Sequence, residues 1–507
     1  MSLKWNIIAS YLSQGYTTLI GILMVPAFVR YMGAEAYGLV GFFAMAQAWF
    51  LLLDIGLTPT ISRETAVFQA GAMDALTLRR LVRLLEGLFL AIALLGSLLM
   101  LLGSGWIAGH WLRVQTLPHH QVQTSLLLMA FIVVLRWIGG LYRGIITGFE
   151  ELVWLGAFNG IASTLRFVAV LAVFKVLGTR PTDFFAYQLG VALLETSVLI
   201  FKAYALLPKV TNLFQGSWDW TFFKNKLRFS LGIAFTGSIW VLVTQTDKLV
   251  LSKLLNLSDY GAFNLAVLVA GGVTTLTAPV SSAILPRLSK LQAEGNSLAL
   301  LELYRTASQG VALITFPVVW LMTLFSGKLI FAWTGNPALA SQVAPILALY
   351  AMGNGILAVT AFPYYLQFAK GDLRLHVLGN GLFVIFLIPS LILATLHFGS
   401  RGAGMAWLLS NLLYLLLWVP LIHRRLAKGL NGPWFFKDIL PIVLAPLACS
   451  LLMKACIAWP STRLAGVALL VALTALFLGF TVCVSTLGRR TFRQYILKTE
   501  PVVTNHN

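Results

Sequence analysis

Apolar segments of about twenty residues recur from one end of this chain to the other. A helix needs about this many apolar residues to cross the hydrocarbon core of a membrane. The segments are continuous and rich in leucine rather than alternating, which argues against a transmembrane β-barrel. Of 507 residues, 59% are hydrophobic and only 10% are charged, and the mean hydropathy is +0.85. The sequence therefore predicts an all-α polytopic membrane protein without a soluble domain.

About fourteen transmembrane helices fit the twenty-residue criterion. The first follows a single Lys4 and has no small-residue cleavage site, so we expect it to be retained rather than removed as a signal peptide. The eighth carries three threonines and Pro279, which weaken its apolar character. The predicted spans are 6–26, 38–57, 84–103, 124–142, 152–177, 184–207, 229–251, 261–285, 308–326, 342–366, 375–397, 402–422, 439–458 and 464–487.

The basic residues divide unevenly between the two sets of loops that these helices define. One set, together with both tails, holds most of the Lys and Arg residues. The other set holds only Arg30, Arg113, Arg180, Lys253, Lys328, Arg401 and Arg463. Cytoplasmic loops carry the excess of basic residues, so we expect both termini to be cytoplasmic. The formal charge of +19 is then mostly a signal of topology, and nucleic acid is not an expected partner.

A weak internal repeat runs through the chain at a separation of about 223 positions. The segment RYMGAEAYG, which starts at Arg30, matches KLLNLSDYG, which starts at Lys253. Gly148 and Gly371 keep this separation, and Trp111 and Trp333 deviate from it by one position. Many transporters are built from repeats of this size. Each copy holds six helices, an even number, so the copies have the same orientation and are related by a pseudo-two-fold axis along the membrane normal.

This repeat predicts two six-helix bundles followed by two further helices. The predicted domains are an N-terminal bundle at 1–207, a cytoplasmic amphipathic linker at 208–228, a C-terminal bundle at 229–422, a cytoplasmic linker at 423–438, helices 13 and 14 at 439–487, and a cytoplasmic tail at 488–507.

A group of motifs near the N-terminus resembles a known family. The segment from Arg30 to Glu64 contains an R-x-x-G-x-x-x-Y-G turn, then D-x-G at Asp54, then S-R-E at Ser62. This pattern is similar to that of the polysaccharide-exporter and O-antigen flippase family, within the multidrug/oligosaccharidyl-lipid/polysaccharide exporter superfamily. The segment TQTDKLVLSKLLNLSDYGAFN, which begins at Thr244, resembles the family's second-half signature.

The resemblance implies a function in surface polysaccharide biosynthesis, including that of lipopolysaccharide O-antigen. Family members move oligosaccharides linked to an undecaprenyl diphosphate lipid across the bacterial inner membrane, from the cytoplasmic to the outer leaflet. The implied mechanism is alternating access. The implied partners are the lipid-linked oligosaccharide, the bilayer, a polysaccharide polymerase and the chain-length machinery, and one chain would suffice as a monomer.

Ionisable residues inside the predicted helices are candidates for the binding site, because such residues usually face a bundle interior or a wet cavity. Asn159 and Arg166 share a helix face with Ser163. An anionic diphosphate needs charge-assisted donors, and arginine offers a bidentate fork. We therefore predict substrate binding by Arg136, Arg166, Lys248 and Asn159, and charge balance or coupling by Asp54, Glu195 and Asp247. Pairing among these charges, which would only lock helices together, is the alternative.

Asp54 poses the sharpest question, because it lies in the apolar segment WFLLLDIGLT. An Asp at the centre of a membrane helix costs about 2.5–3.5 kcal/mol on insertion scales. We expect Asp54 to face a central cavity, where a cationic partner or a bound cation offsets this cost, with Arg166 as the first candidate partner and Arg136 as the second. Gln47 lies two turns away on the same helix face, which indicates that Asp54 has polar surroundings.

Two other functions fit a chain of this composition. A small-molecule exporter of the multidrug branch is one alternative, but Arg136 and Arg166 would repel the cationic drugs that such exporters favour. A polysaccharide polymerase is the other, but it would need a larger catalytic loop than any this chain offers. We expect no enzyme activity and no cofactor, with H⁺ or Na⁺ as the candidate coupling ion. GSRGAG at 399–404 follows no strand and no P-loop motif occurs, so we read it as a turn and expect no ATP site.

Overall fold

A computed structural model describes residues 3–54, 56–210, 238, 241–485 and 487–489, and nearly all of them are helical. The helices in chain order are α1 (Leu3–Met32), α2 (Ala34–Phe50), α3 (Leu57–Gln69), α4 (Ala75–Trp106), α5 (His119–Gly148), α6 (Leu152–Thr164), α7 (Val170–Val176), α8 (Pro181–Leu206), a helix at 241–254, α10 (Leu257–Ala293), α11 (Ser297–Leu324), α12 (Ser326–Thr334), α13 (Pro337–Ala369), α14 (Arg374–Leu413), α15 (Val419–Leu426), α16 (Leu440–Cys456) and α17 (Arg463–Val484). The predicted all-α polytopic fold is confirmed.

Twelve segments in the described part of the chain are long and apolar enough to cross a membrane. The longest, Arg374–Leu426, covers two of the predicted spans. It turns at Gly399, whose φ of 58° and ψ of −143° are not helical, so the predicted turn at GSRGAG is confirmed. The predicted span 229–251 begins among residues outside the described part. Its second half, from residue 241, is described and is helical. The total of fourteen helices therefore stays a prediction.

The chain forms two compact units, which we call unit 1 (Met1–Gly261) and unit 2 (Ala262–Asn507). The sequence places the start of the second bundle earlier, at residue 229. The difference arises because the helix at 241–254 is tied to unit 1. The Trp111 indole N–H donates to Ser252 Oγ at 2.9 Å, and the Leu257 N–H donates to the Arg113 carbonyl at 3.0 Å. Most of the predicted linker 208–228 and of the tail 488–507 lies outside the described residues.

The repeated Tyr-Gly motif occupies the same place in two helices. Tyr37-Gly38 and Tyr260-Gly261 each begin at the fourth residue of a helix, in α2 and α10 respectively. In both helices the glycine allows a close approach of backbones. A Cβ on Gly261 would lie 2.5 Å from the Ala34 carbonyl oxygen, and one on Gly38 would meet the Leu257 carbonyl. The pattern found in the sequence therefore marks equivalent helix starts.

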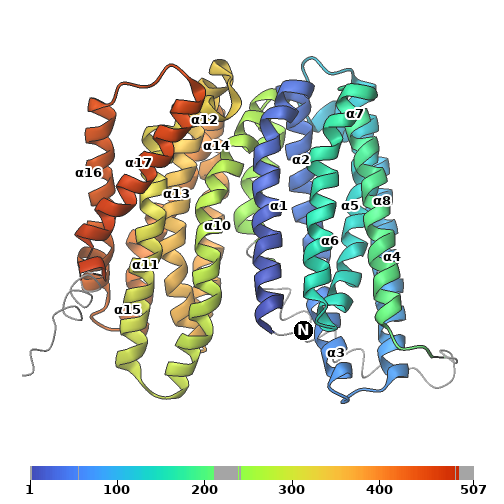
Figure 1. The fold of residues 1–507 in the computed structure, drawn as a ribbon, viewed down its shortest axis with the longest axis horizontal. Coiled ribbons are helices and arrows are strands. Elements are labelled where there is room, and N and C mark those ends of the chain that lie inside the picture. The colour runs from blue at the N-terminus through green and yellow to red at the C-terminus, as the bar shows by residue number, and fades with distance from the viewer. Residues whose placement is uncertain (1–2, 55, 211–237, 239–240, 486, 490–507) are drawn as a thin grey trace, which may run out of the picture. The chain divides into compact units, whose positions relative to one another are not determined.

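Unit 1 is organised around α5. Figure 1 shows α1 beginning at the same end of this unit as α3, and the turn from α1 to α2 at the opposite end. Helices α3, α4 and α8 all pack against α5. The contact with α3 is close because Gly144 and Gly148 lack side chains where they face Thr58, Ile61 and Ser62.

Asp54 ends a single 3₁₀ turn, Leu51–Asp54, that follows α2. The chain then breaks at Gly56, which has a φ of 70°, and restarts as α3. The Asp54 carboxylate accepts from the Thr58 hydroxyl at 2.6 Å and from the Thr58 backbone N–H at 3.2 Å. The first N–H groups of a helix lack intrahelical partners and attract negative charge. These contacts at the start of α3 offset the cost of placing the carboxylate there.

The predicted partnership of Asp54 with Arg166 or Arg136 is wrong. No Lys or Arg side chain of the described residues lies within ion-pair distance of Asp54. The sequence pattern suggested one continuous helix at 38–57 and gave no sign that α3 starts immediately after it. The Asp therefore caps a helix start, and this accounts for its presence in an apolar segment.

Unit 2 has its core around α11 and α13, which the segments after α14 cover. Trp434 is fully buried there, and its indole N–H donates to Ser308 Oγ at 3.0 Å. The Arg305 guanidinium pairs with Asp438, with Nε 2.5 Å from Oδ2. These contacts fix the chain between α15 and α16 against α11.

The glycine contact between α3 and α5 leads to a stability prediction. A Cβ at Gly148 would lie 2.5 Å from the Ser62 carbonyl oxygen and from Thr65 Cβ, and backbone atoms cannot move aside easily. Overpacking of this kind costs roughly 1–3 kcal/mol. Gly148→Ala should therefore lower the melting temperature of the purified protein. Gly190→Ala in α8 is the matched control, because no atom lies within 4 Å of its added Cβ. Equal melting temperatures for the two variants would contradict the close contact.

The predicted orientation can be checked with single cysteines in a protein whose Cys449, Cys456 and Cys483 are replaced by serine. Ala72 lies in the exposed turn between α3 and α4, and Ala338 lies exposed near the start of α13. The charge distribution predicts that the first is cytoplasmic and the second external. A membrane-impermeant maleimide added to intact cells should label Ala338→Cys and leave Ala72→Cys unlabelled. The opposite labelling pattern would reverse the topology.

Candidate functional site

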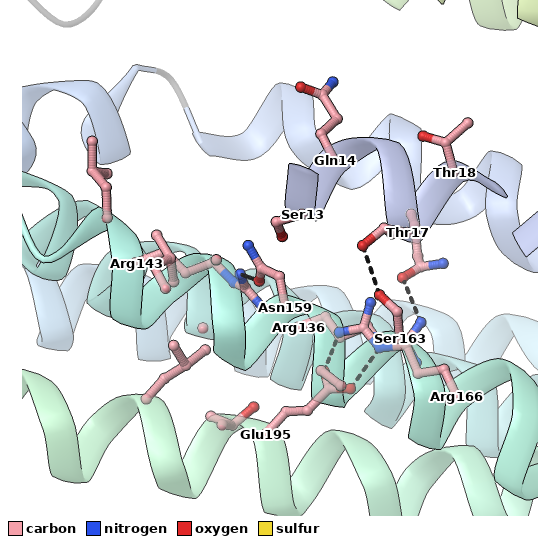
Figure 2. A pocket seen from close by; sticks show the side chains of 18 residues that line it. Ser13, Gln14, Thr17, Thr18, Arg136, Arg143, Asn159, Ser163, Arg166 and Glu195 are labelled. Atoms are coloured by element: carbon pink, nitrogen blue, oxygen red, sulfur yellow. Dashed lines mark hydrogen bonds and ion pairs between the residues drawn. The ribbon is translucent and has the colours of Figure 1, made fainter. Parts of the chain in front are cut away.

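A cavity of about 510 Å³ lies within unit 1, among α1, α5, α6 and α8. Its lining includes three arginines, one carboxylate and a set of hydroxyl and amide side chains. Figure 2 shows these groups converging between the helices. The polar residues of the lining are Ser13, Gln14, Thr17, Thr18, Gln47, Arg136, Arg143, Asn159, Ser163, Arg166, Glu195 and Thr196.

Arg136 projects from the middle of α5 and is held by neutral partners. Its Nη1 donates to Gln47 Oε1 at 3.1 Å, and its Nη2 donates to Gln188 Oε1 at 2.9 Å. Its Nε is buried and has no hydrogen-bond partner among the described residues. The guanidinium also lies over the ring of Phe43, 5.4 Å from the ring centroid. Arg136 is therefore a positioned cation whose charge no carboxylate of the described part neutralises by an ion pair.

Arg143 lies two turns further along α5, on the same face as Arg136. It donates from Nη1 to Asn159 Oδ1 of α6 and lies over the Phe158 ring at 5.4 Å. Its partners are again a neutral amide and an aromatic face. Both contacts hold the guanidinium in place and leave its full charge available to the cavity.

Arg166 differs from the other two arginines because it is paired with Glu195. Its Nε donates to Glu195 Oε1 at 2.5 Å, and its Nη2 donates to Oε2 of the same carboxylate, which makes the pair bidentate. Glu195 is 4% exposed. Arg166 lies in a π-helical turn, Leu165–Ala169. Its backbone carbonyl accepts a hydrogen bond from Gln188 Nε2 at 2.8 Å. Such π-helical turns inside α-helices are frequent at functional sites.

Hydroxyl groups from α1 and α6 also line the cavity. Thr17 Oγ1 of α1 and Ser163 Oγ of α6 are hydrogen-bonded at 2.9 Å. Figure 2 shows Ser13 and Thr17 directed from α1 toward the cluster, whereas Gln14 and Thr18 are directed away from it. Hydroxyl and amide groups both donate and accept hydrogen bonds, which suits them to the hydroxyl groups of a sugar.

The electrostatic balance of the cavity is positive. Three guanidinium groups and one carboxylate leave an excess of two positive charges, carried by Arg136 and Arg143. Arginine forks match the geometry of phosphate oxygens and form strong charge-assisted hydrogen bonds with them. The arrangement is suited to bind a ligand that carries about two negative charges and several hydroxyl groups. It is unsuited to an organic cation.

The structure brings together four of the residues that the sequence predicts for the site, namely Arg136, Asn159, Arg166 and Glu195. It does not bring the others there. Asp247 and Lys248 lie on the helix at 241–254, outside the lining of this cavity, where Lys248 Nζ donates to the Thr244 carbonyl at 2.6 Å and lies 3.5 Å from Asp247 Oδ1. Asp54 caps α3, as described above. The functional roles of all seven residues stay predictions.

Sequence reasoning missed Arg143 and the hydroxyl groups of α1. The sequence already places Arg143 on one helix face with Arg136, seven residues before it, but the predicted site did not include Arg143, which lies just beyond the predicted span 124–142. Ser13 and Thr17 are four residues apart, which gives α1 a polar face. Hydroxyl groups carry no charge, and so they stood out less than the ionisable residues.

Across the described part of the chain, no three His, Cys, Asp or Glu side chains group as a metal site.

The fold and this cavity define a polytopic helical membrane transporter. The sequence model of the polysaccharide biosynthesis protein family matches residues 3–292, more than half of the chain. The chain belongs to this family, and the predicted resemblance is confirmed.

Two proteins with related sequences span almost the same length. A Shigella flexneri protein named as an O-antigen transporter is 19% identical over 420 residues, which cover 82% of this chain and 97% of that protein. A Klebsiella pneumoniae membrane protein of a cps region is 21% identical over 461 residues, which cover 89% of this chain and 88% of that protein.

Two solved structures of membrane transport proteins have a similar fold. The lipid II flippase MurJ in an inward closed conformation gives a TM-score of 0.72 at 15% identity, covering 98% of this chain and all of that one. A multidrug resistance MATE transporter of the MOP superfamily, in an inward-facing conformation, gives a TM-score of 0.66 at 14% identity, covering 81% of this chain and 94% of that one. At such low identity these likenesses concern the fold.

Proposed function

We propose that this protein is a flippase for an oligosaccharide linked to a lipid diphosphate of the undecaprenyl type. It moves this substrate from the cytoplasmic to the outer leaflet of the bacterial inner membrane, for the synthesis of a surface polysaccharide. Both termini are cytoplasmic in this proposal. The observation that carries it is the cavity of unit 1, where an excess of two positive charges lies beside hydroxyl and amide groups.

Each part of such a substrate has a matching part of the cavity. A diphosphate carries about two negative charges, which Arg136 and Arg143 can neutralise through charge-assisted hydrogen bonds. The sugars next to the diphosphate can exchange hydrogen bonds with Ser13, Thr17 and Asn159. The family and its relatives agree with this assignment, since polysaccharide biosynthesis and O-antigen transport are the activities for which they are named.

The proposed mechanism is alternating access between two six-helix bundles. The motivation is the internal repeat, whose copies have the same orientation, as in transporters whose halves are related by an axis along the membrane normal. Glu195 is the carboxylate in the cavity and therefore the candidate for coupling to H⁺ or Na⁺. A change in its charge would change the number of arginine charges that face the substrate.

A small-molecule exporter of the multidrug branch is the competing function, since transporters of that kind share the fold. The cavity disfavours the export of organic cations, because Arg136 and Arg143 would repel them and no carboxylate of the described residues neutralises these two charges by an ion pair.

An experiment in cells can distinguish the two functions. In a strain that lacks its own exporter and retains its glycosyltransferases, the protein should restore surface glycan when it is expressed with its matching polysaccharide genes.

The control for that experiment is the same strain with an empty plasmid, tested in parallel for resistance to cationic drugs. Restored glycan with unchanged drug resistance is the expected result. Raised drug resistance without surface glycan would overturn the proposal in favour of the multidrug exporter.

A further inference from the structure

We propose that unit 1 carries a second site, separate from the transport cavity, that binds a membrane phospholipid through its phosphate. The site is a pocket of about 640 Å³ formed by residues of α4, α5 and α8. Helices α4 and α8 each pack against α5, and the pocket lies between them with α5 as its floor. None of its lining residues lines the transport cavity.

The pocket is polar at one end and apolar at the other. The polar residues Arg83, Tyr142 and Tyr204 lie nearer those ends of α4, α5 and α8 that the charge distribution assigns to the cytoplasmic side. The apolar residues Leu90, Ile138 and Ile200 lie one to two turns deeper along the same three helices. This order matches that of a phospholipid in the cytoplasmic leaflet, with its headgroup at the surface and its acyl chain inside.

The polar end is built around Glu86. Its Oε1 accepts from the Tyr204 hydroxyl at 2.7 Å and from the Tyr142 hydroxyl at 3.1 Å, and its Oε2 lies 3.2 Å from Arg83 Nη1. These contacts occupy the carboxylate and join all three helices. Glu86 therefore shapes the pocket and neutralises one nearby charge.

A second guanidinium, that of Arg79, lies next to this end of the pocket, although Arg79 is not itself one of the lining residues. Arg79 and Arg83 both lie over the ring of Tyr204, with their Cζ atoms 5.2 and 5.5 Å from its centroid. The single carboxylate of Glu86 is paired with Arg83. Arg79 Nε is buried and has no hydrogen-bond partner among the described residues. The unpaired charge and the unused buried donor that an anion at this end could reach are therefore those of Arg79, beside the lining.

The apolar end is exposed at Leu90, which favours a lipid over a free anion. Leu90 is 54% exposed although it lines the pocket, and it lies in the middle third of a long apolar helix. Basic pockets between transmembrane helices on the cytoplasmic side bind anionic lipid headgroups. An acyl chain that follows the apolar side chains from the headgroup would cover this opening.

The test uses the full-length protein in detergent, with dioctanoyl phosphatidylglycerol as the probe. A ligand that binds only the folded state raises its melting temperature in a saturable way. We expect such a rise with this probe. We expect no rise with the same concentration of inorganic phosphate, because phosphate lacks the acyl chains.

Two variants test whether the lipid binds in this pocket. Arg79→Gln with Arg83→Gln removes the cations and should raise the half-saturating concentration at least tenfold. Leu90→Trp fills the apolar end, keeps every charge and should have a similar effect, which guards against misfolding of the charge variant. Lys290→Gln is the matched control, because it removes an exposed basic residue of unit 2 and should leave half-saturation unchanged.

Three results would overturn the proposal. The first is the absence of a saturable rise with the lipid. The second is an equal rise with inorganic phosphate, which would indicate a simple anion site. The third is an unchanged half-saturating concentration in Leu90→Trp and in the arginine variant, which would place the lipid elsewhere on the protein.

Discussion

Arg136→Gln is expected to reduce export of the lipid-linked oligosaccharide by about a hundredfold or more. A hydrogen bond to a charged group is worth roughly 1.5–3 kcal/mol, and the guanidinium can give two of them to a diphosphate. Their loss amounts to roughly 3 kcal/mol or more, and each 1.4 kcal/mol corresponds to about tenfold. The partners of Arg136 are the neutral amides of Gln47 and Gln188, so glutamine leaves no carboxylate unpaired. The measurement is surface glycan display, normalised to the amount of protein in the membrane.

Arg401→Gln is the matched control for this prediction. Arg401 is exposed in unit 2, next to the turn at Gly399, so its loss should leave display close to that of the unchanged protein. Full display by Arg136→Gln at a normal protein level would show that the cavity does not bind the substrate through this arginine.

Glu195→Ala is expected to lower the free energy of unfolding by about 3–5 kcal/mol. Removing one partner of a buried ion pair leaves the other charge uncompensated, and costs of this size are typical. Glu195 is 4% exposed and holds both Nε and Nη2 of Arg166. The melting temperature of the purified protein, followed by tryptophan fluorescence, should fall by several degrees.

The double variant Glu195→Gln with Arg166→Gln separates a structural from a functional role of this pair. Because it removes both charges together, it should regain most of the stability that Glu195→Ala loses. If Arg166 also contacts the substrate, as predicted, surface glycan should stay low in the double variant despite the recovered stability. Normal display would leave Arg166 and Glu195 as a structural pair only.

The fold was largely predictable from the sequence because membrane helices require long apolar segments. Two features of the structure, however, do not show in the pattern of apolar segments. The chain between Asp54 and Leu57 breaks and restarts within one apolar segment, so a pattern of hydropathy shows one helix where the structure has α2, a short 3₁₀ turn and α3. The division between the compact units depends on where the helix at 241–254 packs, and hydropathy contains no information on packing partners.

The site could be predicted by residue type but not by pairing. Arg136, Arg166 and Glu195 were identified because ionisable groups in a membrane are costly and seldom lie there without function. Which carboxylate meets which arginine depends on side-chain positions on neighbouring helices. Arg166 and Glu195 are 29 positions apart, on either side of α7, and the spacing along one helix cannot show that they meet. Asp54 was assigned to the cavity for the same reason, and its true partner is Thr58, four residues away.

The most direct test of the central claim is a flipping assay with purified protein. Proteoliposomes would contain an undecaprenyl diphosphate oligosaccharide, and the fraction that reaches the opposite leaflet would be measured over time with an enzyme confined to that side. Proteoliposomes with the unchanged protein are predicted to move the substrate, those with Arg401→Gln to match them, and those with Arg136→Gln to be about a hundredfold slower or worse. Equal rates for Arg136→Gln and the unchanged protein, or no movement above protein-free liposomes, would contradict the assignment of this cavity to a lipid-diphosphate oligosaccharide.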